Sequence, residues 1–473
     1  MLHLGVDHAV PSAVRLVAHG RTVLKPAANV LKDLAQYSNI SLRSDSSLVG
    51  AVVTAAAHDD EQRAKKQAEK DTKDKDDKDT ALRRKPGLKP VPAWGGRSIE
   101  ITPWDVLHVL GRAIALSRRG AARGLAEHWG ALKYSQALTG DTRSFMKLSA
   151  EGKMTAEHYK NLQSRELGIG FALVAAQRVL TQRYPDRVVS IVPADTTLSA
   201  GWSARGTYRP QYFAELWKPG EPSLVLPIAC KGNHSNAARS YSQLASASAH
   251  VETVHIGPWN ETPVFIFSTE LPPDGHVTVH ALCALGRGGW LSRPHAESEG
   301  LDVKLSDENY FPEIRLPTES DNPPSSVTGF HVTPERYEWF RRVIARTDAA
   351  GLTAFAGDGG ATTQYLTDRQ GAKNFTGFAH AAAGSVQDVA HTLFGIRFTG
   401  TDHVFRLNGT RVEAFSGVAD DLLHLLAEGR VEQYRREIYE RRSSWPSNSS
   451  NVSWNGPVSV HPDGTVLAMR LLS

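Results

Sequence analysis

A lysine follows a short apolar stretch in the middle of the chain. Residues 226–230 carry only apolar side chains, and Lys231 and Gly232 come directly after them. An ammonium group at the end of a buried strand loses part of its hydration, which costs free energy unless a carboxylate or a phosphate lies beside it. We therefore expect Lys231 to be paired with an acidic group of the protein or with an anionic ligand.

Two acidic residues upstream are candidate partners for this lysine. Asp195 comes soon after the apolar run 188–192, and Glu215 lies within the run 212–217. Carboxylates and one lysine at the end of a small sheet are the groups that a metal-dependent phosphodiesterase needs, because carboxylate oxygens bind Mg²⁺ and an ammonium can hold a phosphate. The residue types therefore favour phosphodiester hydrolysis as the chemistry.

Alternating helices and strands are expected to position these residues. Apolar residues at helical spacing predict a helix from about Thr155 to Tyr184, which carries Glu166. Short β-branched and apolar runs predict strands, and a segment rich in small residues predicts a further helix that contains Gln243. The expected strands are 188–192, 212–217, 224–230, 263–267 and 277–282, and the further helix is 237–254.

This order of elements resembles the core of the PD-(D/E)XK nuclease superfamily, over residues from about 155 to 270. Members of that family carry a glutamate on the first helix, an aspartate on the second strand, and an acid two residues before a lysine on the third strand. These groups surround one or two metal ions that activate water against a phosphodiester. The resemblance implies the same sheet and the same reaction for this chain.

The resemblance also implies roles for particular residues. Lys231 matches the family lysine and would act on the phosphate or on the attacking water, and Gln243 would assist it. Glu166 matches the acid of the helix, and Asp195 or Glu215 matches the acid of the second strand. Glu166, Asp195 and Glu215 would therefore ligate Mg²⁺ or Mn²⁺.

One position departs from the family pattern. The residue two places before Lys231 is Ala229, where the family has an acid. Two explanations are possible. In the first, Glu215 on the neighbouring strand supplies the missing carboxylate, because a metal ion requires oxygens at the correct distance and any strand can provide them. In the second, the site has lost its activity and the fold only binds a partner.

Polar and basic residues near the lysine are suited to contact phosphates. His234 follows Lys231 in a polar cluster and is either a general base or an ordinary loop histidine. Arg205, Tyr208 and Arg209 form a basic and aromatic loop between the first two strands. This loop either follows a nucleic-acid backbone or is an ordinary surface loop.

The composition is that of an intracellular globular protein. The chain has 473 residues, 41% of them apolar and 22% charged, with a net charge of +4. Its cysteines, Cys230 and Cys283, are far apart in sequence, so we expect neither a disulfide framework nor a zinc knuckle. The first residues do not resemble a secretory signal, and no apolar window is long enough for a membrane span. We therefore expect a soluble, cytoplasmic protein with no membrane partner.

Charge runs and proline clusters divide the chain. We expect an N-terminal appendage (1–57), a charged, disordered linker (58–93), an α/β nuclease-like domain (94–315), a second linker (316–326) and a mostly helical C-terminal domain (327–473). The expected fold class is α/β, with a small mixed β-sheet of the restriction-endonuclease type flanked by helices. The C-terminal domain is expected to be a helix-rich α+β unit.

Two functions from different classes follow. The first is a metal-dependent nuclease that hydrolyses phosphodiester bonds of DNA or RNA, as enzymes of restriction, repair or phage defence do. The second is a non-catalytic scaffold or interaction protein on the same fold. Nucleic acid is the expected partner, and the C-terminal domain could add a protein partner or a second copy of the chain.

Overall fold

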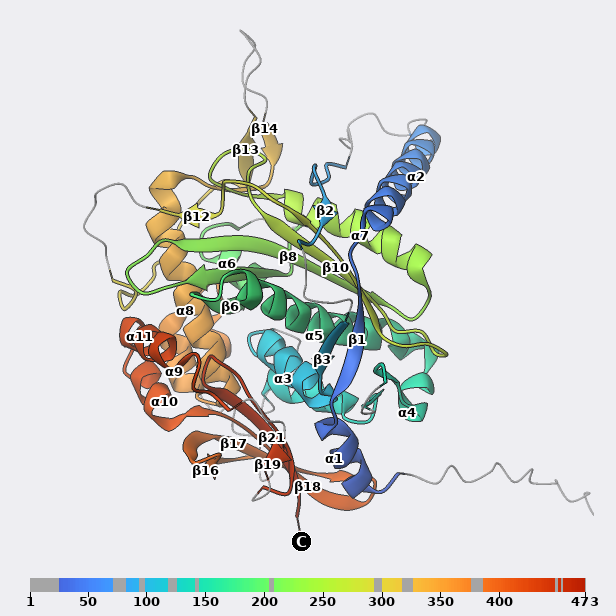
Figure 1. The fold of residues 1–473 in the computed structure, drawn as a ribbon. Helices are drawn as coiled ribbons and strands as arrows, with labels where there is room; N and C mark the ends of the chain where they lie inside the picture. The colour runs from blue at the N-terminus through green and yellow to red at the C-terminus, as the bar shows by residue number, and fades with distance from the viewer. Residues whose placement is uncertain are drawn as a thin grey trace, which may run out of the picture.

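A mixed nine-stranded sheet lies at the centre of the protein (Figure 1). The computed structural model describes residues 25–70, 82–92, 98–117, 126–140, 144–203, 208–292, 300–316, 326–375, 386–446, 450–451 and 454–472. Along the main path of this central sheet, the strands pair in the order β3 (Ser98–Ile101), β1 (Ser38–Arg43), β11 (Thr278–Ala284), β10 (Val264–Glu270), β8 (Ser223–Asn233), β7 (Tyr212–Trp217) and β6 (Val188–Pro193). In addition, β12 (Trp290–Leu291) pairs with β8, and β2 (Lys89–Pro90) pairs with β11.

The expected alternation of elements is confirmed in this sheet. Strands β6, β7 and β8 form an antiparallel meander, and β10 pairs in parallel with β8. A parallel neighbour needs a crossover connection, which helix α7 (Ala237–Glu252) provides. The helix expected before the meander is α5 (Glu157–Arg183). The protein is thus an α/β protein with a mixed sheet flanked by helices.

Helices α5 and α7 cover opposite faces of the central sheet (Figure 1). Because side chains alternate along a strand, neighbouring residues of β8 enter different cores. Cys230 packs in the same core as Phe171 of α5, whereas Ala229 packs in the same core as Leu244 of α7. Lys231 is two residues after Ala229, so its side chain lies on the α7 face.

The backbone of α5 lies directly against β8. A Cβ atom on Gly232 would lie 2.0 Å from the carbonyl oxygen of Ser164, and one on Gly168 would lie 2.8 Å from the carbonyl oxygen of Lys231. Both glycines are therefore needed for the close approach of helix and strand. This contact closes the α5 face of the sheet at the end of β8.

A second, antiparallel sheet forms the C-terminal part of the protein and corrects the expectation that residues 327–473 are mostly helical. It is six-stranded, and a tight Asn408–Gly409 turn with positive φ at both residues joins two of its strands. Asn-Gly is a strong hairpin signal, so the sequence does contain a reason for this difference. The strands pair in the order β16 (Val386–Leu393), β17 (Ile396–Leu407), β18 (Thr410–Ala419), β21 (Thr465–Leu471), β20 (Gly456–Val460) and β19 (Ser450–Asn451).

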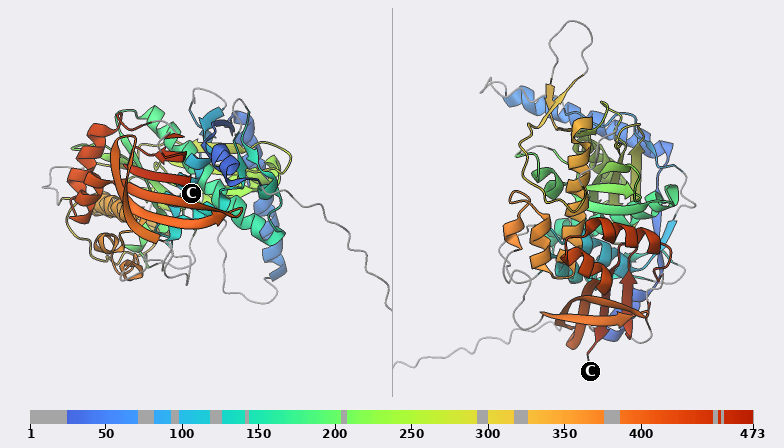
Figure 2. Two further views of the ribbon diagram at one scale, coloured as in Figure 1. Left: turned by 90° about the horizontal axis from the view of Figure 1, so that it is seen from below. Right: turned by 90° about the vertical axis from the view of Figure 1, so that its left-hand side faces the viewer.

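A layer of helices lies between the two sheets (Figures 1 and 2). It contains α1 (Ala27–Ala35) and α3 (Pro103–Ile114), and α3 begins at a capping box in which Thr102 and Asp105 each accept the other's backbone N–H. One continuous apolar core joins this layer to both sheets. Apart from α2, which is described below, the remaining helices of the described chain are η1 (Glu127–Tyr134), α4 (Ala150–Lys153), α6 (Ala194–Ser199), η2 (Pro334–Arg336), α8 (Tyr337–Phe355), α9 (Gly359–Tyr365), η3 (Ala372–Asn374), α10 (Asp420–Ala427) and α11 (Val431–Arg441).

Small strand pairs complete the described chain. They are β4 (Leu138–Thr139) with β5 (Lys147–Leu148), β9 (Val254–Ile256) with β15 (Phe330–Val332), and β13 (Glu313–Arg315) with β14 (Ser326–Thr328). No described helix combines the length and the apolar composition that crossing a bilayer requires.

The expected disordered linker, residues 58–93, is in part a helix. Residues 58–70 belong to α2 (Ser46–Lys70), which lies beside α7 and is anchored by the buried side chains of Leu48 and Val52. Farther on, Arg84 forms ion pairs with two aspartates of α2. Apolar contacts at the start of the helix and the ion pairs of Arg84 thus hold this charged segment against the rest of the protein. Residues 71–81 lie outside the described chain.

Part of the expected N-terminal appendage, residues 1–57, contributes directly to the central sheet. Strand β1 lies within the sheet, between β3 and β11. Residues 1–24 and residues 317–325, which make up most of the expected second linker (316–326), lie outside the described residues.

The contact between α5 and β8 gives a stability prediction. We expect Gly232→Ala to lower the free energy of unfolding by about 1–3 kcal/mol, because the new methyl group overpacks against the carbonyl of Ser164. A Cβ atom on Gly50, which is exposed in α2, would meet nothing within 4 Å. Gly50→Ala should therefore raise stability by about 0.5–1 kcal/mol. Urea unfolding of both variants tests the pair, and equal effects would contradict it.

Candidate functional site

Lys231 lies near the carboxyl end of β8, half-buried on the face that α7 covers. Its Nζ is 3.3 Å from Nε2 of His250 in α7, and Nδ1 of His250 is 2.7 Å from the carbonyl oxygen of Arg209. Since a carbonyl only accepts, Nδ1 of His250 donates, and Nε2 of the neutral ring accepts from Lys231. The ammonium group is thus held by a neutral imidazole.

Within the described part of the chain, no carboxylate forms an ion pair with Lys231. Burial, together with the charge of Arg165, lowers the pKa of Lys231. Burial and the charge of Lys231 likewise lower the pKa of His250. Both shifts have the sign that burial and a neighbouring positive charge give to a basic group.

A row of polar residues crosses the central sheet at the level of Lys231. In the strand register, Lys231 of β8 pairs with Ser268 of β10, Ser268 pairs with His280 of β11, and His280 pairs with Arg43 of β1. Ser268 and His280 are buried. Hereafter we refer to these four residues as the polar row.

Gln243 of α7 lies over the polar row and is the expected late polar residue. Its Nε2 donates to the carbonyl oxygen of Gly232 at 2.8 Å, and its Oε1 accepts from Ser268 at 2.7 Å and from Asn233 at 3.0 Å. The amide therefore fastens α7 to the ends of β8 and β10. Of the expected site residues, Gln243 and Lys231 are brought to the same place.

The outer end of the polar row holds a histidine–carboxylate pair. Nε2 of His280 is 2.9 Å from a carboxylate oxygen of Glu270, and Arg43 donates to the hydroxyl of Tyr241 at 2.6 Å. The sequence analysis did not single out Arg43, Tyr241, Glu270 or His280. Polar residues at alternate positions near the end of β10, Ser268 and Glu270, were the signal that could have found the row.

Glu166 does not face Lys231. Its buried carboxylate accepts from Tyr134 at 2.8 Å and pairs with Lys133 at 2.6 Å, and both partners belong to η1. Gly168, two residues later, faces β8, so Glu166 projects from the opposite side of α5. Helix α5 and the sheet therefore separate its carboxylate from the lysine.

Glu215 is also held away from Lys231. In the antiparallel register it pairs with Val225, six residues before Lys231 on β8. Its buried carboxylate accepts from both terminal nitrogens of Arg435 in α11, at 2.5 and 3.1 Å, and from Ser223 at 2.7 Å. Glu215 thus forms a bidentate ion pair with Arg435. It does not supply the metal-binding carboxylate that was expected in place of Ala229.

Asp195 is the one expected acid at the same end of the sheet as Lys231. Its side chain is 79% exposed and pairs at 3.2 Å with Arg209, whose carbonyl accepts from His250. At the start of β7, Gln211 accepts from the backbone N–H of Cys230 at 2.9 Å. The side chain next to Cys230 at this end of the sheet is therefore an amide and not a carboxylate. Glu166, Asp195 and Glu215 lie too far apart in the fold to surround a single metal ion.

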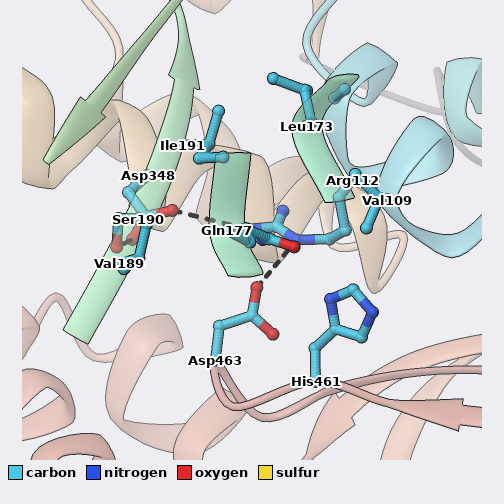
Figure 3. Close-up of a pocket in the computed structure, with 11 residues that line it drawn as sticks. Val109, Arg112, Leu173, Gln177, Val189, Ser190, Ile191, Asp348, His461 and Asp463 are labelled. Carbon is cyan, nitrogen blue, oxygen red and sulfur yellow. Dashed lines mark hydrogen bonds and ion pairs between the residues drawn. The ribbon is translucent and has the colours of Figure 1, made fainter. Parts of the chain in front are cut away.

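Figure 3 shows a second polar cluster, which lies in a cavity between α3, β6, α8 and the turn before β21. Arg112 lies between two carboxylates, 3.2 Å from Asp463 and 3.5 Å from Asp348. Ser190 donates to the second oxygen of Asp348 at 2.7 Å. These residues come from distant parts of the sequence, so no spacing pattern indicated them.

The two acids of this cavity have pKa values shifted in opposite directions. Burial raises the pKa of Asp348, and the charge of Arg112 offsets this only in part. Burial also acts to raise the pKa of Asp463, but Arg112 and His461 outweigh it, so this pKa is lowered. One arginine between two acids thus stabilises the charge of only one of them fully.

A third cluster lies on the C-terminal sheet. His391, Asp402 and Glu413 each offer one ligand atom, and these atoms lie within 4.8 Å of one another. They are close enough to hold a metal ion, in a part of the protein where the sequence analysis placed none.

The different settings of two expected acids give a stability prediction. Glu215→Gln leaves Arg435 buried beside a neutral group, so we expect a loss of about 3 kcal/mol in the free energy of unfolding. Asp195→Asn removes only an exposed pair and should change stability by less than about 0.5 kcal/mol. Chemical denaturation measures both, and a stable Glu215→Gln variant would contradict the assignment.

The Arg112 cluster gives a prediction of pH dependence. The pKa of Asp348 is raised above 3.8, the ordinary value for aspartate, so the folded protein loses stability as the pH rises above that value. Asp348→Asn removes this loss and should gain stability relative to wild type over that range. Asp463 has a lowered pKa and contributes stability that is present above 3.8 and lost in acid. Asp463→Asn should therefore lose stability relative to wild type as the pH rises. Unfolding from about pH 3 to about pH 7 tests whether the two variants diverge.

No family model matches this chain, and neither a curated protein nor a solved structure was found to be similar to it. The function therefore has to be argued from the geometry described above.

Proposed function

We propose that the carboxyl end of the central sheet binds the phosphate backbone of a nucleic acid, with Lys231 as the central contact. The carrying observation is that the ammonium of Lys231 is half-buried, has a lowered pKa and forms no ion pair with a described carboxylate. A phosphate beside it would supply the missing negative charge. Binding should therefore restore an ordinary pKa to Lys231.

The two helices next to Lys231 carry further cations. Arg165 is exposed on α5, has no hydrogen-bonded or ionic partner in the described chain, and lies close enough for its charge to act on Lys231. Arg239 is exposed in the first turn of α7, which contains no acidic residue. Tyr208 is 38% exposed and packs edge-on against His250 at 5.0 Å. Cations next to an exposed aromatic ring suit a single-stranded backbone with its bases.

The arrangement favours binding over hydrolysis. Glu166 and Glu215 are used inside the fold, so only Asp195 among the expected metal ligands is available at this end of the sheet. The proposal is therefore the non-catalytic form of the restriction-endonuclease-like fold. Its partner would be DNA or RNA, contacted mainly through its phosphates, because the lysine and arginine side chains here offer positive charge.

A metal-dependent nuclease is the second candidate. Two observations favour it: the order α5, β6, β7, β8, α7, β10, and the position of Asp195 at the same end of the sheet as Lys231. This candidate needs carboxylates that the described residues near Lys231 do not supply as a set.

Binding of fluorescent duplex DNA, single-stranded DNA and single-stranded RNA tests the proposal. We expect Lys231→Met to weaken binding about tenfold, because it removes a charged contact while keeping the apolar stem. The slope of the logarithm of the binding constant against the logarithm of the salt concentration should become shallower by about one. Arg165→Ala should act in the same direction, whereas Arg436→Ala, which removes an exposed arginine of α11, should not.

The same proteins are then incubated with plasmid and single-stranded substrates in Mg²⁺ or Mn²⁺. Intact substrate with wild-type protein is the expected result. Cleavage that Lys231→Met abolishes would replace the proposal by the nuclease. Absence of nucleic-acid binding by the wild-type protein would overturn both and direct the search to protein partners.

A further inference from the structure

The histidine–carboxylate cluster of the C-terminal sheet lies on three neighbouring strands. His391 belongs to β16, Asp402 to β17 and Glu413 to β18. Nε2 of His391 is 3.1 and 3.2 Å from the two carboxylate oxygens of Asp402, and ligand atoms of all three residues lie within 4.8 Å of one another. These strands are hydrogen-bonded along their length, so their backbones fix the positions of the three side chains.

The two carboxylates of the cluster are buried and carry like charges. Asp402 and Glu413 are 7% and 8% exposed. Two carboxylates so close together in a place with little water require positive charge. Arg470 of β21 supplies part of it through an ion pair with Glu413, and this arginine is one-third exposed at the edge of the cluster.

Aromatic rings hold the imidazole in place. His391 packs edge-on against Phe415, with ring centres 4.6 Å apart, and against Trp454, with ring centres 5.0 Å apart. Arg470 lies over the ring of Trp454 at 4.1 Å. The imidazole is therefore pre-oriented, with Nε2 toward the carboxylates, so little side-chain entropy would be lost on binding an ion.

We propose that His391, Asp402 and Glu413 bind one divalent transition-metal ion of the Zn²⁺ type. One imidazole nitrogen and two carboxylate oxygens suit Zn²⁺, Co²⁺ or Mn²⁺, and the imidazole disfavours Mg²⁺ and Ca²⁺. Arg470 leaves Glu413 and turns to solvent as the ion enters, so one positive charge is exchanged for two. The ion then fastens β16, β17 and β18 to one another.

Arg470 makes the site testable by a gain as well as a loss. An arginine paired with a ligand competes with the metal, so its removal should strengthen binding. We expect Arg470→Gln to bind Zn²⁺ at least about tenfold more tightly than wild type, because a charge-assisted hydrogen bond no longer has to be broken. A variant that simply misfolds could not give this result.

The experiment is titration calorimetry of chelator-stripped full-length protein with Zn²⁺, together with thermal unfolding with and without the ion. One ion per chain and a higher unfolding temperature are expected for the wild-type protein. His391→Ala and Asp402→Asn should lose both effects. His424→Ala, which removes a histidine from an exposed pair with Glu428, is the matched control and should keep them.

Two outcomes would overturn the site. One is equal binding by wild type and His391→Ala, because the ion would then be held elsewhere. The other is an Arg470→Gln variant that folds and binds Zn²⁺ no better than wild type. Neither outcome bears on Lys231, so this inference and the proposed function can fail separately.

Discussion

The buried carboxylate of Glu215 and the guanidinium of Arg435 form the contact on which the arrangement of the two sheets depends. Either charge alone inside the protein would cost several kcal/mol, so the position of α11 against the central sheet is fixed by electrostatics as well as by apolar packing. Further contacts continue from Arg435. Arg435 stacks on Trp217 at 4.6 Å, Trp217 donates to Ser190, and Ser190 donates to Asp348 of α8. A chain of polar contacts thus runs beside the apolar core from the central sheet into the C-terminal half.

This use of charge removes two of the expected acids from the surroundings of Lys231. An acid whose oxygens are filled by a bidentate arginine has few lone pairs left for a metal ion, and Glu166 is similarly engaged by Tyr134 and Lys133. At the carboxyl end of β8 the balance is reversed, because Lys231 and the nearby Arg165 of α5 form no ion pair with a described carboxylate. The protein thus places its paired charges where the sheets join and its unpaired cations at an accessible end of the central sheet.

Local patterns in the sequence predicted the elements well but not the partners of individual side chains. Each strand of the meander was indicated by its own apolar residues, and the helix with Gln243 by its small residues, because these signals lie within a few positions of one another. The partner of Glu215 lies 220 residues away, and no local pattern reports such a distance. The direction of Glu166 was equally hidden, since it depends on where η1 packs against α5. The residue types at the candidate site were therefore predictable, and the pairing that decides which of them remain free was not.

The place of β1 in the central sheet has a consequence for how the chain folds. The hydroxyl of Ser44, just after this strand, donates to the carbonyl of Ala281, 237 residues later, and β1 pairs in parallel with β11. At synthesis rates of about 5–20 residues per second, β1 would leave the ribosome roughly 10–50 seconds before its neighbour β11 exists. The strands of the β6, β7 and β8 meander pair with one another over short sequence distances, so this pairing can form during that interval. Strand β1 can pair early with β3, but its other edge must stay unpaired until β11 is made, which makes that edge the natural point for chaperone contact.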